Sequence, residues 1–131
     1  MKILIVTPHY YPEQFKITEI AESLSQIYDV EVWTNIPNYP KGDFYKGYNW
    51  FKNRKQVING VSVKRLPIIP RKRHFITQAL NYCSFYILGM MRTLFAKKNY
   101  DLIINYQLSP VYSAYPGLKM GKKCKAPVIT Y

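Results

Sequence analysis

A short apolar run at the start of the chain is the feature that most constrains the fold. Residues 3–6 read ILIV, directly after Met1 and Lys2, and the run ends before Pro8. Consecutive apolar, partly β-branched residues are typical of a strand that is buried on both faces, as in a parallel sheet. The polar cluster PHYYPE then follows the carboxyl end of this strand, where open α/β sheets bind ligands. The run therefore predicts a sheet type and the position of a site.

The next segments continue the alternation of strand and helix. Apolar residues recur at spacings of three and four over residues 15–27, which predicts an amphipathic helix. Residues 30–34, VEVWT, predict a second strand, so the two strands are expected to be joined by a right-handed parallel crossover. Residues 35–55 are rich in Asn, Pro, Gly and Tyr and are too long for a simple connection, so we expect a functional loop.

The second half of the chain extends the same pattern. The pair Asn59-Gly60 lies between apolar residues and predicts a hairpin. The elements expected after it are a long helix over 75–97, a strand over 101–105, a helix over 109–122 and a strand over 126–131. Together they predict an α/β fold with a Rossmann-like parallel sheet flanked by helices, formed by residues 1–131 as one domain.

The charge balance points to an anionic partner. The 131 residues contain 19 Lys and Arg against 7 Asp and Glu, a net charge of +12. Nucleic acid, an anionic membrane surface and a phosphate-bearing ligand all suit such a balance. Nucleic acid is disfavoured, because the basic residues are not interleaved with aromatic residues on a sheet face and no helix-turn-helix, zinc-finger or RRM pattern occurs. A dinucleotide is also disfavoured, because PHYYPE replaces the glycine-rich loop.

The cysteines and the amino terminus bear on location. Cys83 and Cys124 have no metal-binding or redox spacing, which predicts packing roles, no metal site and a reducing compartment. The first residues lack the long apolar region and cleavage site of a signal peptide. These features predict a cytoplasmic protein.

Several stretches resemble a known family. MKILIVTPHYYPEQF, VEVWTNIPNYPKG, INGVSVKRLPIIP, LNYCSFY and DLIINYQLSP occur in this order. They resemble the amino-terminal half of a GT-B glycosyltransferase, of the GT4-like group that builds bacterial surface polysaccharides such as O-antigen and capsule. NYPKG and LNYCSFY are similar to the aminosugar and fucosaminyl-type transferases of that group. The resemblance implies an acceptor-binding lobe for a lipid-linked saccharide, with no cofactor in this lobe.

The same resemblance implies that another lobe is needed. Enzymes of this group hold the nucleotide-sugar mainly in a carboxyl-terminal domain, which has no counterpart in residues 1–131, and the sequence stops on Tyr131 at the end of a predicted strand. We therefore expect an incomplete domain that is inactive alone. It would work with a donor-binding partner chain or associate as a homo-oligomer.

His9 and Glu13 are the candidate catalytic residues. A neutral imidazole at the end of the first strand is suited to accept a proton or bind a sugar hydroxyl, although His9 could also be an ordinary exposed loop residue. Glu13 is placed to accept a hydrogen bond from an acceptor hydroxyl. Alternatively, its carboxylate is favoured there by the positive end of the following helix.

The candidate acceptor-binding residues follow the first, second and fifth predicted strands. Tyrosine suits sugars because its ring is apolar and its tip is polar. The alternative is that these tyrosines fasten the long loop to the sheet, and that the hydroxyl of Ser109 caps the next helix. The candidates are Tyr10, Tyr11, Asn38, Tyr39, Tyr48 and Ser109.

Basic residues flank the long apolar helix and form a candidate membrane and anion patch. These residues are Arg71, Lys72, Arg73, Lys97 and Lys98. The apolar run is too short to span a bilayer, which takes about 20 residues, but it suits peripheral contact with the inner face of the cell membrane. A buried core helix with solvated ends is the alternative. A non-catalytic membrane-recruiting subunit and a nucleic-acid-binding module remain alternative functions.

Overall fold

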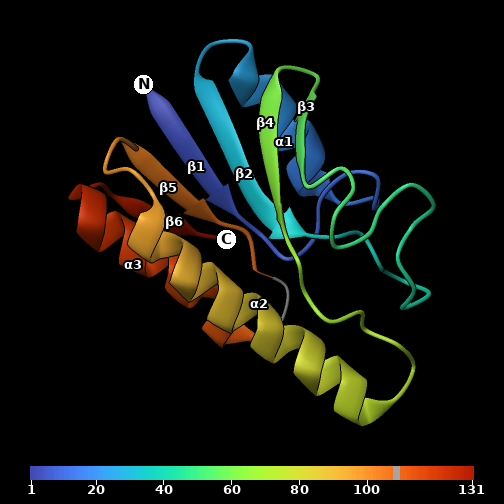
Figure 1. Ribbon diagram of the computed structural model, residues 1–131. Helices are drawn as coiled ribbons and strands as arrows, with labels where there is room; N and C mark the ends of the chain where they lie inside the picture. Colours follow the sequence, from blue (N-terminus) through green and yellow to red (C-terminus); the bar gives the residue numbers. More distant parts are fainter. Residues whose placement is uncertain (108–109) are drawn as a thin grey trace.

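The described residues, 1–107 and 110–131 of a computed structural model, form a six-stranded sheet covered by helices on both faces (Figure 1). The strand order is β3-β4-β2-β1-β5-β6, and β3 runs antiparallel to β4 while the other neighbouring pairs are parallel. The strands are β1 (Lys2–Val6), β2 (Asp29–Asn35), β3 (Lys55–Ile58), β4 (Val61–Leu66), β5 (Leu102–Asn105) and β6 (Val128–Thr130). The predicted α/β class with a parallel, Rossmann-like sheet is confirmed.

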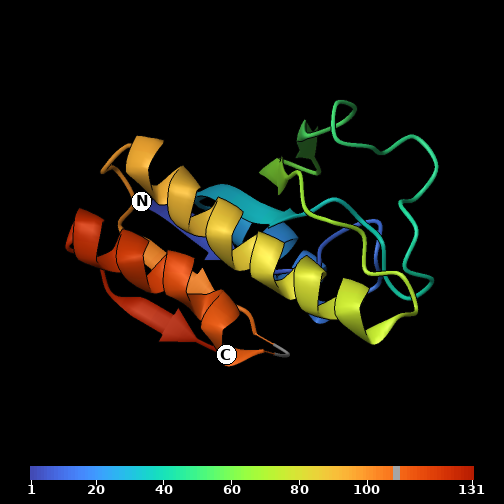
Figure 2. The ribbon, with the colours of Figure 1, turned by 60° about the horizontal axis from the view of Figure 1, so that its bottom comes forward.

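The helices divide between the two faces of the sheet. They are α1 (Lys16–Ser25), α2 (Phe75–Phe95), the 3-10 helix η1 (Val111–Ala114) and α3 (Tyr115–Cys124). Helix α1 covers one face, and α2 and α3 lie side by side on the other (Figure 2). Strand β1 is buried on both faces, as its sequence predicts: Ile3 and Ile5 pack with the residues of α1, while Leu4 and Val6 pack with those of α2 and α3.

The element boundaries differ from the predictions at several places. The hairpin is confirmed, and Asn59 (φ 47°) and Gly60 (φ 83°) form its two-residue turn, which needs positive φ at both positions. Helix α2 ends at Phe95 rather than at residue 97. The prediction of one helix over 109–122 is wrong, since η1 precedes α3 and Pro116 occupies the first turn of α3, the helical position that proline tolerates.

Helix α2 approaches α3 closely at Gly89. A Cβ on Gly89 would lie 2.6 Å from Cγ of Pro116, so a side chain there would force the two helices apart. The outer surface of α2 carries an exposed Cys83, which corrects the packing role predicted for this thiol, whereas Cys124 is half-buried at the end of α3. Among the described helices, none combines the length and apolar character needed to cross a membrane.

Candidate functional site

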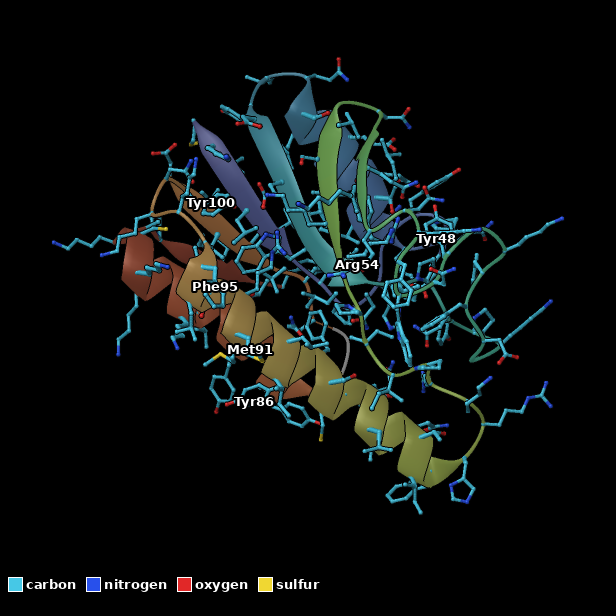
Figure 3. All side chains as sticks on the ribbon, in the orientation of Figure 1. Tyr48, Arg54, Tyr86, Met91, Phe95 and Tyr100 are labelled. Atoms are coloured by element: carbon cyan, nitrogen blue, oxygen red, sulfur yellow. The ribbon has the colours of Figure 1, made fainter. Side chains whose placement is uncertain are left out.

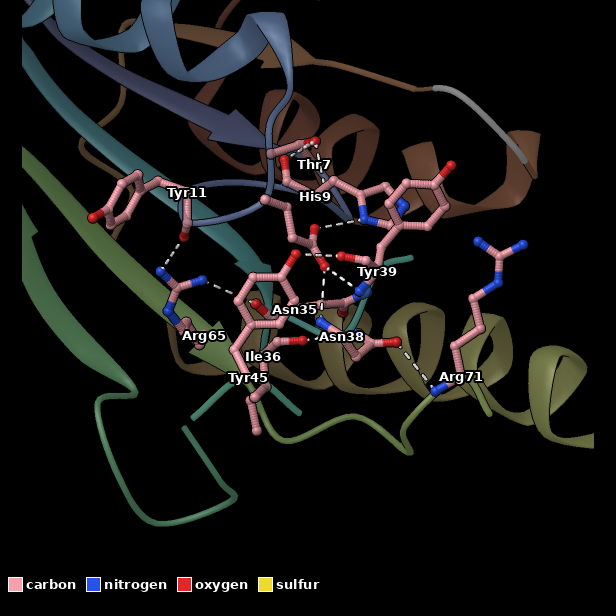
Figure 4. A network of polar contacts seen from close by, with 11 residues as sticks. Thr7, His9, Tyr11, Asn35, Ile36, Asn38, Tyr39, Tyr45, Arg65 and Arg71 are labelled. Carbon is pink, nitrogen blue, oxygen red and sulfur yellow. Dashed lines mark hydrogen bonds and ion pairs between the residues drawn. The ribbon is translucent and has the colours of Figure 1, made fainter. Parts of the chain in front are cut away.

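The loops that follow β1 and β2 meet at the carboxyl edge of the sheet around Glu13 (Figure 4). Glu13 is only 3% exposed. Its Oε1 accepts hydrogen bonds from the backbone N–H groups of Asn38 (2.8 Å) and Tyr39 (2.7 Å), and its Oε2 lies 2.7 Å from Nδ1 of His9. One carboxylate therefore joins two loops that are 25 residues apart in the chain.

His9 is held in one orientation by this network. Because the Glu13 carboxylate accepts hydrogen bonds, Nδ1 of His9 is the nitrogen that donates, and Nε2 is left as the acceptor in the neutral ring. The ring stacks on Phe15 at 4.6 Å between centroids and meets the edge of Tyr39 at 5.2 Å. The hydroxyl oxygen of Thr7 accepts from the backbone N–H of His9. A histidine oriented by a carboxylate is an arrangement suited to general-base chemistry.

Arg65 on β4 donates hydrogen bonds to both loops at the same edge. It is 1% exposed, and its Nη2 and Nη1 donate to the carbonyl oxygens of Tyr11 (2.5 Å) and Asn35 (3.2 Å). The guanidinium also lies 4.9 Å from the centre of the Tyr48 ring. Burial lowers the pKa of Arg65. The sequence analysis did not select Arg65, although an arginine within the strand VSVKRL is a visible signal of a buried polar role.

The structure changes the roles of two predicted contact residues. Tyr10 is 1% exposed and packs in the core, and burial raises the pKa of its phenol, so its predicted contact with an acceptor is corrected to a packing role. Asn38 is also 1% exposed; its side-chain amide donates to the carbonyl of Ile36 and its Oδ1 accepts from the backbone N–H of Arg71. Asn38 thus shapes the loop rather than facing a ligand.

The tyrosines that remain at the surface are the candidates for ligand contact. Tyr11 is 46% exposed and Tyr39 is 38% exposed, and each lines one of the two hollows described below. Tyr48 is half-buried against Arg65. Ser109 lies outside the described residues.

The basic patch divides into two separate clusters. The Arg71 guanidinium lies 5.5 Å from the Tyr39 ring and 5.6 Å from the Tyr82 ring, so it lines the rim of the site. Lys72 pairs with Asp43, and Arg73 is exposed. Lys97 and Lys98 are exposed beyond the other end of α2, whose 21 residues span about 30 Å.

Two hollows adjoin the Glu13 network. One, of about 320 Å³, is lined by Tyr39, Pro40, Arg71, Lys72, Arg73 and Gln78. The other, of about 530 Å³, is lined by residues between Tyr11 and Glu19. Within residues 1–107 and 110–131, no three His, Cys, Asp or Glu side chains are grouped so that they could hold a metal ion. The site can therefore offer a base, aromatic rings and positive charge to a polar ligand.

Comparisons with known proteins identify the fold alone. No protein-family model and no curated protein matches the chain. The chain is similar to two solved structures of the C-terminal domain of PF1911 hydrogenase from Pyrococcus furiosus. The structure of residues 78–226 is 15% identical with a TM-score of 0.55, covering 98% of this chain and 89% of that one. The structure of residues 83–215 is 14% identical with a TM-score of 0.56, covering 99% and 90%. The fold and the site thus define an α/β protein with a mostly parallel, Rossmann-like sheet.

Proposed function

We propose that this chain is the acceptor-binding lobe of a glycosyltransferase that uses a lipid-linked saccharide. The observation that carries the proposal is the His9–Glu13 pair, held at the carboxyl edge of the sheet beside the partly exposed ring of Tyr39. In this role, Nε2 of His9 removes the proton of an acceptor hydroxyl as that oxygen attacks the anomeric carbon of the donor sugar. Glu13 orients the ring and stabilises the imidazolium that forms.

The proposed reaction needs a second lobe for the nucleotide-sugar. That lobe would be a donor-binding domain or partner chain, facing the edge that carries His9. Arg71 supports this orientation, because its guanidinium lies beside Tyr39 at the same edge and supplies positive charge where a diphosphate would leave. The resemblance of the sequence to GT4-like enzymes supports the same assignment.

The outer face of α2 supports a location at a membrane surface. Ile76, Leu80, Ile87, Met91 and Leu94 are exposed by 44–63% and share one side of the helix. The basic clusters at residues 71–73 and 97–98 flank this stripe. A helix with an exposed apolar stripe and basic ends suits the interface of an anionic bilayer. This face also favours the second candidate function, a membrane-recruiting subunit without catalytic residues.

A titration with a soluble acceptor analogue tests the proposal. The chain contains two histidines, His9 and His74, so their imidazole NMR signals form a built-in comparison. We expect farnesyl diphosphate linked to N-acetylglucosamine to shift the His9 signals and to leave those of His74, which caps α2, almost unchanged. His9→Gln should weaken binding about tenfold, because a buried hydrogen-bond partner of the ligand is lost.

Two outcomes separate the candidate functions. Equal affinity of His9→Gln and the parent chain, or a saturating ligand that leaves the His9 signals unmoved, contradicts the acceptor-binding lobe. If the same chain nevertheless binds anionic vesicles, the membrane-recruiting subunit becomes the better assignment.

A further inference from the structure

A third hollow, which we call the recess, lies between α2 and the sheet, away from the edge that carries His9. Its floor comes from β2 and β4, and one wall comes from the carboxyl-terminal half of α2 (Figure 3). Lys2 and Tyr100 line it at the amino ends of β1 and β5, which is the opposite end of these strands from the His9 site. The recess has a volume of about 560 Å³, within the range of small-molecule sites.

The described lining residues of this recess are strongly basic. Glu31 is the one carboxylate among them, and it accepts hydrogen bonds from Nε1 of Trp33 (2.7 Å) and from Nζ of Lys64 (2.9 Å). The charge of Glu31 is therefore already balanced within the protein. The basic lining residues are Lys2, Arg54, Lys64, Arg92 and Lys97.

Arg92 is the central basic residue of the recess. Its guanidinium lies 5.0 Å from the centre of the Trp33 ring, and its Nε is buried with no hydrogen-bond partner among the described residues. A buried donor without an acceptor is unfavourable, so an acceptor that reaches this guanidinium would stabilise the arrangement. Burial lowers the pKa of Arg92; the nearby Glu31 and Tyr100 oppose this shift, and the positive charge of Arg54 adds to it.

Arg54 brings a second guanidinium to the same recess. Its Nε donates to the carbonyl of Arg65 (3.2 Å), and within the described part of the chain it forms no ion pair with a carboxylate. The two guanidinium groups carry like charges, and an anion bound between them would reduce their repulsion. Guanidinium groups bind phosphate particularly well, because their planar N–H donors match its oxygens.

Apolar side chains line the recess beside these charges. Leu88, Met91 and Phe95 lie on α2, the helix that also carries Arg92, and Leu66 lies on β4. Phe95 and Met91 remain 85% and 51% exposed. Figure 3 shows Met91 and Phe95 on α2, with Arg54 on the far side of the recess. An anion that fills this recess would thus place carbon atoms against α2.

We propose that this recess binds the phosphate group of an organic phosphate ester. Arg92 and Arg54 donate hydrogen bonds to the phosphate oxygens, and the carbon part of the ester packs on Met91 and Phe95. The inference does not depend on the glycosyltransferase proposal, because it uses neither His9 nor the loops around Glu13. The ester could be a soluble metabolite or the headgroup of a phospholipid, which share this chemistry.

Two probes test the inference and separate these sources. One is glycerol 3-phosphate, and the other is dihexanoyl phosphatidylglycerol kept below its micelle concentration. We expect at least one ester to produce saturable shifts of the Nε–H signals of Arg92 and Arg54 and of the Trp33 indole N–H in ¹⁵N spectra. Tighter binding of glycerol 3-phosphate would identify a soluble ester, and tighter binding of the phosphatidylglycerol would identify a lipid headgroup.

Variants link the response to the recess. Arg92→Gln and, separately, Arg54→Gln should each raise the Kd about tenfold, the loss expected for a hydrogen bond to a charged group. Lys16→Gln, which removes the same charge from an exposed position on α1, should leave the Kd within about twofold.

Three results would overturn the inference. They are the absence of shifts at these signals with both esters at millimolar concentration, an equal loss of affinity in Lys16→Gln, and equal affinity for inorganic phosphate and both esters. If Arg92→Gln does not fold, Arg54→Gln alone decides, because Arg54 lies at the rim and is only partly buried.

Discussion

Helices α1 and α2 cover opposite faces of the same sheet, but α2 also carries an outward apolar stripe in addition to the apolar residues that it buries. Helix α1 buries Ile17 and Ala21 against the sheet and exposes charged residues such as Glu19. Helix α2 buries Asn81 and Thr93 together with Phe85 and Gly89, while an apolar stripe faces outward. The first is the usual amphipathic pattern of a core helix. The second leaves apolar surface exposed, which is typical of a surface that contacts something else.

Polar contacts at both ends of α2 add to the apolar packing of Phe85 and Leu88. The Asn81 amide donates to the carbonyl of Ile69 at 2.7 Å. At the other end, Nζ of Lys123 on α3 donates to the carbonyl oxygens of Thr93 and Ala96, both at 2.6 Å. A lysine at the carboxyl end of a helix satisfies free carbonyl groups and interacts favourably with the helix dipole. Side-chain hydrogen bonds thus fix α2 with its apolar stripe outward.

The largest expected effect comes from truncating one isoleucine on each helix. Ile17→Ala should lower the free energy of unfolding by about 2–5 kcal/mol, because it leaves a cavity in the core beneath α1. Ile87→Ala removes the same atoms from a side chain that is 53% exposed, and should change stability by less than about 0.5 kcal/mol. Urea unfolding of both variants measures the difference. Equal losses would show that the outer face of α2 is packed in solution.

The sequence predicted the sheet and the type of most elements because each signal is local. The ILIV run, the helical spacing of α1 and the Asn59-Gly60 turn depend on neighbouring residues alone. The helix predicted at 109–122 failed at its start, where prolines and a 3-10 turn decide the backbone path. In the site, the structure places His9, Glu13 and Tyr39 together at one sheet edge, while their predicted roles stay predictions.

The remaining features of the site depend on contacts between distant residues. Glu13 bonds to residues 25 and 26 positions away, and Arg65 bonds to Tyr11, 54 positions away. A local sequence pattern does not show which distant residues will contact each other. The sequence therefore did not predict that Tyr10 and Asn38 are buried. The recess at Arg92 was missed for the same reason, because its residues come from three strands, three connecting segments and the end of α2.

The next largest effect concerns binding of the α2 stripe to a membrane. Replacing Ile87 and Leu94 together by Gln should weaken binding to phosphatidylglycerol vesicles by about tenfold or more, because the apolar area available for burial falls. Co-sedimentation at low salt measures the binding. The matched control replaces Ile20, which is exposed on α1, and Ile27, which is exposed just after this helix, by Gln and should bind like the parent chain.

The basic ends of α2 sharpen this test. Replacing Lys97 and Lys98 by Gln should also weaken vesicle binding, by about 1 kcal/mol for each lysine, and this loss should vanish at high salt. An equal loss of vesicle binding in the Ile20 and Ile27 control and in the Ile87 and Leu94 variant would contradict the prediction. It would mean that α2 does not contact the membrane through its apolar stripe.

The smallest effect lies on the floor beneath α2, at Glu31. Burial alone would raise the pKa of this carboxyl, but hydrogen bonds from Lys64 and Trp33 outweigh it and hold the pKa below its usual value. A carboxyl whose pKa is lower in the folded state stabilises the fold above its unfolded pKa of about 4.3, and this contribution is lost as the pH falls through the folded pKa.

Glu31→Gln should therefore destabilise the chain by about 1 kcal/mol at pH 7, since glutamine keeps an acceptor for Trp33 but loses the ion pair with Lys64. The difference from the parent chain should shrink as the pH falls from about 4.3 through the lower pKa of the folded carboxyl, below which the parent carboxyl is protonated as well. Urea unfolding at a series of pH values measures it. The matched control on α1 is Glu19→Gln. The Glu19 side chain is 77% exposed, so the stability difference between this variant and the parent chain should change little with pH. A Glu31 effect that is constant over the whole pH range would mean that the ion pair with Lys64 contributes nothing, and that the floor beneath α2 is held by the Trp33 hydrogen bond and packing alone.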